Sequence, residues 1–147
     1  MIETMNEKQV IEFLQNQHEM NYVLGWDDEI KVLTIASKNP VIANNRIPNP
    51  WHRYEIDLKR ADPYVVAVRE KTGHYSLILF CYQKVQCAKT VHQDGEYQKK
   101  ILHFPGSKDK KSAQMQLEAV RHLIKLQGNT ITSLDLNKSI TRLQLEQ

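Results

Sequence analysis

The chain has 147 residues, a length that predicts one domain spanning 1–147 with a hydrophobic core of its own. Its 41% hydrophobic and 25% charged residues are typical of a globular protein and exclude a low-complexity chain. Lys and Arg number 20 against 17 Asp and Glu, so the net charge of +3 permits a polyanionic partner without requiring one. The longest apolar run, Leu77–Tyr82, is too short to cross a membrane, and we expect a cytoplasmic protein with no membrane partner.

The N-terminal part of the chain predicts a helix followed by a β-hairpin. In Asn6–Gln17, apolar residues recur on one side of a helix, and Asn6 is available as its N-cap. Tyr22–Leu24 and Ile30–Ile35 then have the apolar pattern of strands. We expect the turn between them at the intervening Gly25–Asp28.

The stretch Ser37–Trp51 contains three prolines and four asparagines, a composition that breaks helices and strands and predicts a long surface loop. Trp51, His52 and Arg53 follow at its end. One interpretation is an exposed aromatic and basic cluster that stacks on bases or contacts anions. The other is that Trp51 folds back and anchors the loop on the core.

The middle of the chain has the pattern of successive antiparallel strands, with turns at Glu70–Gly73 and Gln93–Gly95. The expected strands are Tyr54–Leu58, Tyr64–Val68, Tyr75–Tyr82, Val85–Val91 and Tyr97–Phe104, of which Val85–Val91 either continues the preceding strand or forms another. Cys81 and Cys87 lie in apolar sequence here, and we interpret them as buried thiols in a reducing compartment.

The strongest helical pattern lies within Gly106–Gly128, where Ala113, Leu117, Val120 and Ile124 define a broad apolar face. Gly128 stands where a left-handed C-terminal cap is expected. Beyond it, Asn129–Gln147 suggests a short extended piece and a C-terminal helix. The predicted fold class is therefore α+β: a mainly antiparallel sheet of four to six strands, an N-terminal helix, and an amphipathic helix at 112–127 packed on one face.

Three lysines, Lys108, Lys110 and Lys111, crowd the start of this helix, where the helix dipole is already positive and acidic residues are favoured. Lysines beside unpaired backbone N–H groups make such a place suitable for a phosphate or another anion. The alternative interpretation is a solvated, lysine-rich loop.

Motifs that link residue spacing to a catalytic mechanism, such as GxSxG, a P-loop, GxGxxG, HExxH or CxxC, are absent from the sequence. We therefore assign no catalytic residues and no cofactor. The histidines and cysteines at 74, 81, 87, 92 and 103 match no usual zinc spacing, so we assign no metal site. The triplet Asp57-Leu58-Lys59, with Asp27 or Asp28 upstream, resembles the carboxylate and lysine set of a metal-dependent nuclease, but an amphipathic strand with one solvated side is the favoured explanation.

The segment Tyr64–His74, the following strand Tyr75–Tyr82 and the helix opened by Gly106-Ser107 and Lys110-Lys111-Ser112-Ala113 resemble, over residues 64–126, a double-stranded-RNA-binding domain. The resemblance implies three antiparallel strands packed on two helices, a loop after the first strand that enters a minor groove, and helix-entrance lysines that bridge phosphates. It assigns the loop contact to His74 and the phosphate contacts to Lys110 and Lys111.

Two functions follow from these patterns. The first is a non-enzymatic module that binds the backbone of RNA or DNA through Lys108, Lys110, Lys111, His74, Trp51, His52 and Arg53. The second is a small protein-interaction factor, such as an adaptor, chaperone or inhibitor, without catalytic activity. Whether Arg53 and Arg121 share a face with the lysines distinguishes the two, because a shared basic face favours nucleic acid and an exposed apolar patch favours protein.

Overall fold

A computed structural model describes residues 1–17, 22–37, 53–82, 85–92, 95–105 and 107–132. Two helices and eight strands lie within these ranges, with 3₁₀ turns at Ile2–Thr4 and Leu58–Arg60. The helices are α1 (Glu7–Gln15) and α2 (Lys110–Leu126), and the strands are β1 (Tyr22–Asp27), β2 (Val32–Ser37), β3 (Arg53–Asp57), β4 (Val66–Arg69), β5 (Tyr75–Phe80), β6 (Ala88–His92), β7 (Gly95–Lys99) and β8 (Ile101–Pro105). The α+β class is confirmed, and every strand pair is antiparallel.

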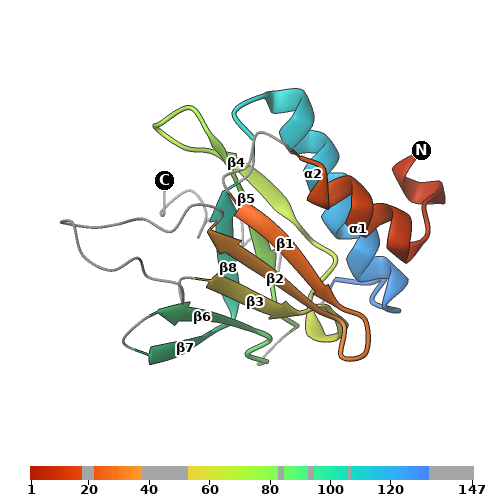
Figure 1. Ribbon diagram of the computed structural model, residues 1–147, viewed down its shortest axis with the longest axis vertical. Helices are drawn as coiled ribbons and strands as arrows, with labels where there is room; N and C mark the ends of the chain where they lie inside the picture. Colours follow the sequence, from red (N-terminus) through yellow and green to blue (C-terminus); the bar gives the residue numbers. More distant parts are fainter. Residues whose placement is uncertain (18–21, 38–52, 83–84, 93–94, 106, 133–147) are drawn as a thin grey trace.

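The strands form two sheets rather than one, a five-stranded sheet in the order β1-β2-β3-β6-β7 and a three-stranded sheet in the order β4-β5-β8 (Figure 1). In the large sheet, Leu33 on β2 lies opposite Ile56 on β3, and both side chains are buried. Because successive residues of a strand point to opposite faces, Thr34 and Glu55 lie on the other side of that sheet and are only half-buried. The large sheet therefore has an apolar inner face and a polar outer face.

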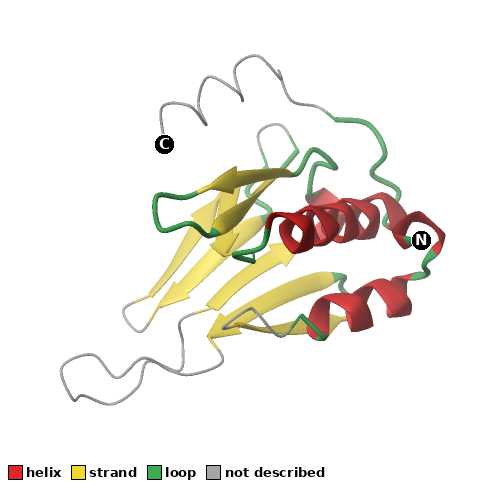
Figure 2. Ribbon diagram, turned by 90° about the horizontal axis from the view of Figure 1, so that it is seen from above, coloured by secondary structure: helices red, strands yellow, loops and turns green. Residues whose placement is uncertain are grey.

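The two helices pack together against the strands (Figure 2). As predicted, Asn6 caps α1: its side chain accepts a hydrogen bond from the Gln9 backbone, while the Gln9 side chain accepts one from the Asn6 backbone. Leu117 and Ile124 of α2 are buried in the main core, which confirms the apolar face predicted for this helix. Gly128 has the left-handed φ of +96° expected of a C-terminal cap.

The three-stranded sheet has α2 behind it and a small apolar cluster in front. Leu77 and Leu79 of β5 belong to the core shared with α2. Ile78 and Phe80 point the opposite way, where Phe80 stacks on Tyr64 with 5.8 Å between the ring centroids. Strand β5 is thus buried on both faces, as its continuous apolar sequence predicts.

The first hairpin differs from its prediction, because its turn lies after Asp27 instead of at Gly25–Asp28. Gly25 is paired with Thr34 inside the sheet. The Asp27 carboxylate accepts hydrogen bonds from the backbone of Glu29 and Ile30, and Lys31 takes a positive φ of 57°. The turn is therefore held by an aspartate and a left-handed lysine, and no glycine is used.

The predicted strand Tyr97–Phe104 is also wrong as a single element. It divides into β7 and β8 at Lys100, and the two pieces belong to different sheets. The same change of sheet separates β5 from β6, so Val85–Val91 contributes a new strand instead of extending the previous one. The two segments in which the chain passes from one sheet to the other, after β5 and before β8, lie side by side, because the Cys81 backbone donates a hydrogen bond to the Lys100 carbonyl.

Cys81 and Cys87 are joined in a disulfide, so the interpretation of these residues as free thiols is wrong. Both are buried, as expected, at 5% and 7% exposure. The bond spans the crossing from the three-stranded sheet to the five-stranded sheet. It is a covalent link between the two sheets.

The proline-rich stretch Ser37–Trp51 lies outside the described residues apart from Ser37, and so does the predicted C-terminal helix within Asn129–Gln147. In the described part of the chain, neither helix combines the length and apolar character needed to span a bilayer.

Candidate nucleic-acid interface

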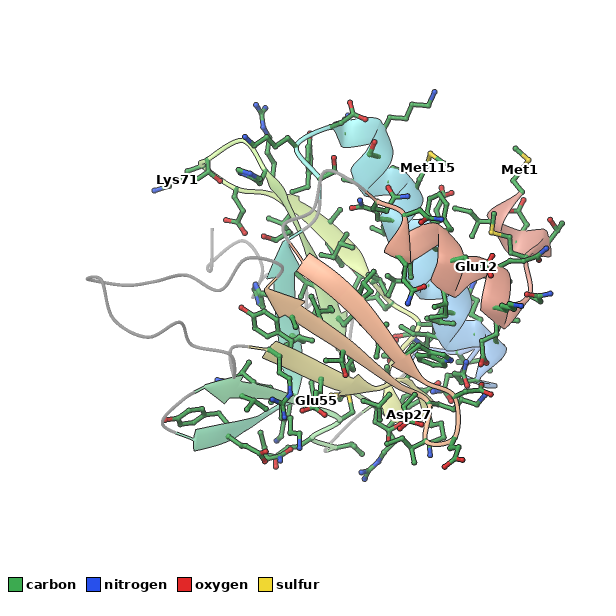
Figure 3. All side chains as sticks on the ribbon, viewed as in Figure 1. Met1, Glu12, Asp27, Glu55, Lys71 and Met115 are labelled. Atoms are coloured by element: carbon green, nitrogen blue, oxygen red, sulfur yellow. A yellow bond between two sulfur atoms is a disulfide. The ribbon has the colours of Figure 1, made fainter. Side chains whose placement is uncertain are left out.

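The β4–β5 hairpin carries two exposed cations beside its turn. The backbone of Gly73, with a φ of +89°, donates a hydrogen bond to the Glu70 carbonyl, which closes the turn predicted for Glu70–Gly73. Arg69 ends β4 and Lys71 lies in the turn, and both are exposed. Hairpin closure therefore presents two positive side chains near one tip, where Figure 3 labels Lys71.

The entrance of α2 is shaped by two side chains that satisfy its backbone. Ser107 is fully buried, and its hydroxyl oxygen accepts a hydrogen bond from the Asp109 backbone at 3.0 Å. Asp109 is the N-cap, and its carboxylate accepts one from the Ser112 backbone at 2.8 Å. The N-cap of α2 is therefore Asp109, and the two neighbouring serines, Ser107 and Ser112, do not cap the helix.

One hydrogen bond fixes the hairpin beside this helix entrance. The backbone N–H of Tyr75, the first residue of β5, donates to the Ser107 carbonyl at 3.0 Å. Figures 1 and 3 show the hairpin tip and the start of α2 at the same end of the molecule. We call the exposed cations gathered there the basic cluster: Arg69, Lys71, Lys108, Lys110 and Lys111.

The basic cluster is not neutralised within the described residues. None of its five side chains takes part in the ion pairs found there, which all involve other cations. Two carboxylates lie nearby, those of Glu70 and Asp109. Hydrogen bonds from Ser112, followed by the charge of Lys111, lower the pKa of Asp109, so this carboxylate is directed to the helix backbone while the lysines remain exposed.

His74, the predicted loop contact, follows the hairpin turn and is half-buried. Its Nδ1 lies 3.2 Å from the Thr72 hydroxyl. His74 is thus part of the hairpin that carries Arg69 and Lys71, although those two exposed cations were not singled out from the sequence. The signal that could have found them is their position, since Arg69 directly precedes the predicted turn and Lys71 lies within it.

Arg53 lies elsewhere. It is the first residue of β3, on the outer face of the five-stranded sheet, and its Nε is 3.0 Å from a carboxylate oxygen of Glu55. Arg121, on α2, donates to the Val65 carbonyl and is half-buried. Neither arginine joins the basic cluster, so the face shared by the lysines with Arg53 and Arg121, which would favour nucleic acid, is not formed. Trp51 and His52 lie outside the described residues.

The residues that suggested a nuclease have structural partners. Asp57 caps the 3₁₀ turn by accepting a hydrogen bond from the Lys59 backbone, and Asp27 holds the first hairpin turn. Cys81 and Cys87 are bonded to each other and are thereby removed as metal ligands. Across the ranges that the structure describes, no group of three His, Cys, Asp or Glu side chains is arranged to hold a metal ion.

Comparisons with protein-family models, with curated proteins and with solved structures find no match to this chain.

Proposed function

We propose that this protein is a non-enzymatic module that binds the phosphate backbone of RNA or DNA through the basic cluster. The observation that carries the proposal is the Tyr75–Ser107 hydrogen bond, because it joins the cations of a hairpin and those of a helix entrance into one surface. A single run of lysines is often only a solvated loop. Five exposed cations from two separate elements form a broader positive surface, which suits several phosphates of one strand or duplex.

The architecture around the cluster supports the same proposal. The strand order β4-β5-β8, followed by α2 packed behind the sheet, is the arrangement that the resemblance to a double-stranded-RNA-binding domain implies for its sheet and last helix. The segment before β4 differs, because it contains β3 and a 3₁₀ turn where that resemblance implies a helix. We therefore rest the proposal on the charged surface, and binding through phosphates requires no base sequence.

The affinity of a positive surface for nucleic acid falls as the salt concentration rises, and the steepness of this dependence can be measured. The full chain is titrated against fluorescein-labelled single-stranded and double-stranded oligonucleotides of RNA and DNA, at a series of salt concentrations, by fluorescence anisotropy. Replacing Lys108, Lys110 and Lys111 with Gln lowers the slope of log K against log salt by about 0.7–0.9 for each phosphate that is no longer neutralised by a lysine. The melting temperature stays equal or rises slightly, since repulsion with the helix dipole is removed.

The matched control replaces three other exposed lysines, Lys8, Lys59 and Lys125, with Gln, which changes the net charge equally. We expect this control to keep the wild-type slope. Equal loss in both triple variants would show that net charge alone drives binding and would overturn the assignment to the basic cluster. A wild-type chain that binds none of the oligonucleotides at low salt would overturn the function.

A further inference from the structure

A groove of about 380 Å³ lies between α1 and the first hairpin, away from the basic cluster. Its lining includes Ile11, which is nearly buried, and the half-buried ring of Trp26. The charged residues of the lining are the carboxylates Glu7, Glu12 and Asp28 and one cation, Lys8. Figure 3 shows the labelled Glu12 on the side of the molecule opposite Lys71. The groove thus combines an apolar, aromatic wall with an acidic rim.

The groove is elongated along α1. At one end the Trp26 indole N–H donates to Glu7 at 3.2 Å, and at the other the Gln15 amide donates to the Leu24 carbonyl at 3.0 Å. Glu7 and Gln15 both line it and are eight positions apart, which corresponds to about 12 Å along a helix axis. About four residues of extended chain cover that length. These dimensions suit a peptide segment better than a single small ion.

The acidic rim already binds one cation of the chain. The Lys31 ammonium lies 2.7 Å from an oxygen of Asp28 and 3.0 Å from an oxygen of Glu7. These hydrogen bonds, that of Asp28 first, raise the pKa of Lys31, so the environment favours a positive charge. Glu12 extends the rim by a third carboxylate, against Lys8 as the one cation in the lining. Three carboxylates against the two cations Lys8 and Lys31 leave a surplus of one negative charge for a ligand.

Trp26 adds a second preference for cations. Its indole N–H donates to the Glu7 carboxylate, and a negative charge at that position increases the electron density of the ring. The face of an electron-rich indole attracts ammonium and guanidinium groups. Guanidinium is the better fit, because its planar fork can stack on the ring and hydrogen-bond a carboxylate at the same time.

We infer that this groove binds a basic, extended segment of a partner protein, with an arginine side chain stacked on Trp26 and paired with Glu12. The acidic rim disfavours nucleic acid there, so this site and the basic cluster select partners of opposite charge. The inference is independent of the proposed function. Loss of binding at one surface leaves binding at the other intact.

The test follows the indole N–H signals of the ¹⁵N-labelled full chain by NMR. The chain has two tryptophans, and the variant Trp51→Phe assigns the Trp26 signal by elimination. A capped peptide of about five residues with two arginines is titrated to about millimolar concentration. Its twin carries glutamines in place of the arginines. We expect a saturable shift of the Trp26 signal with the arginine peptide and none with the glutamine peptide.

Reversing the charge of one carboxylate of the groove tests whether charge determines the binding of the peptide. Glu12→Lys weakens binding of the arginine peptide about tenfold or more, since it places a like charge beside the guanidinium. Glu70→Lys, an equal charge change on the distant hairpin, leaves this affinity unchanged. Both residues are exposed, so neither change disturbs the core. An unshifted Trp26 signal, equal binding of the two peptides, or a Trp26 signal that changes with protein concentration alone would each overturn the inference.

Discussion

The outer face of the five-stranded sheet and the basic cluster both carry cations, but only the first is neutralised by its own neighbours. On the sheet, Glu55 pairs with Arg53 along β3 and with Lys89 across the strand boundary, at 3.0 and 4.0 Å, and Lys89 reaches Glu96 at 3.5 Å. We call these four residues the charge ladder. The cluster on the hairpin and α2 has no comparable pairing among the described residues.

The number of basic residues in a region therefore does not measure its capacity to bind a polyanion. A phosphate that approaches Arg53 competes with a carboxylate held 3.0 Å away. A phosphate that approaches Lys108 or Lys110 displaces only water and counterions. Whether a cation can bind a phosphate depends on whether a carboxylate already pairs with it, and the variants below change this pairing.

The largest expected effect concerns the core on which both regions depend. Leu117→Asp or Ile124→Asp places an unpaired charge at a site that is 5% or 0% exposed, which costs several kcal/mol of a total stability of roughly 5–15 kcal/mol. Thermal melting followed by circular dichroism should show an unfolded chain. Met115→Asp, on the exposed side of the same helix, should melt close to wild type. Wild-type melting of both core variants would refute the orientation of α2.

The next effect concerns the covalent link between the two sheets. Removing the disulfide with Cys81→Ala and Cys87→Ala should lower the free energy of unfolding by about 2 kcal/mol, the entropic value for so short a loop. Urea unfolding with and without a thiol reductant measures it. The reductant should destabilise the wild type and leave the double variant unchanged. If the reductant leaves the free energy of unfolding of the wild type unchanged, the two cysteines are unpaired thiols.

A smaller effect contrasts the two charged regions directly. Arg69→Gln with Lys71→Gln removes two unpaired cations, and we expect the salt slope of oligonucleotide binding to fall by about 1.4–1.8. Arg53→Gln with Lys89→Gln makes the same charge change in the charge ladder. We expect this second pair to keep the slope and to lose at most about 1 kcal/mol of stability. If the salt slope of oligonucleotide binding is the same in the two double variants, paired and unpaired cations contribute equally to binding, which would contradict the proposal.

The smallest effect concerns the N-cap of α2. The lowered pKa of Asp109 means that its charged form is favoured in the folded state. Its contribution is complete above the ordinary aspartate pKa and is lost as the pH falls through the lower folded value. The stability difference between wild type and Asp109→Asn should therefore shrink on acidification, as measured by urea unfolding at a series of pH values. If the stability difference between wild type and Asp109→Asn stays constant with pH, the charge of Asp109 does not stabilise the folded state.

Local patterns in the sequence predicted the elements that depend on neighbouring residues. Asn6 at the start of α1, Gly73 in the hairpin and Gly128 after α2 each perform the role expected of them, because caps and turns involve residues a few positions apart. The start of α2 was predicted less well. The sequence pattern does not identify the N-cap of this helix, which is the side chain of Asp109.

The features that the sequence could not reveal depend on contacts between distant residues. The division of 97–104 at Lys100 follows from a change of sheet, and the disulfide follows from the crossing that brings Cys81 and Cys87 together. The pairing of Arg53 with Glu55 is local, two positions along β3, but the pairing of Lys89 with the same carboxylate is cross-strand, and no local pattern indicates it. Separating free cations from paired ones therefore requires the register of β3 against β6.

Amide chemical-shift changes in the ¹⁵N-labelled chain, mapped during titration with an unlabelled RNA duplex at low salt, locate the binding surface residue by residue. We expect the changes to concentrate on Arg69–His74 and on 107–112, the backbone of the hairpin tip and of the α2 entrance. Amides of the charge ladder on β3 and β6 should remain unperturbed. Changes concentrated on β3 and β6, with the hairpin and the α2 entrance unaffected, would contradict the claim that unpaired cations define the binding surface.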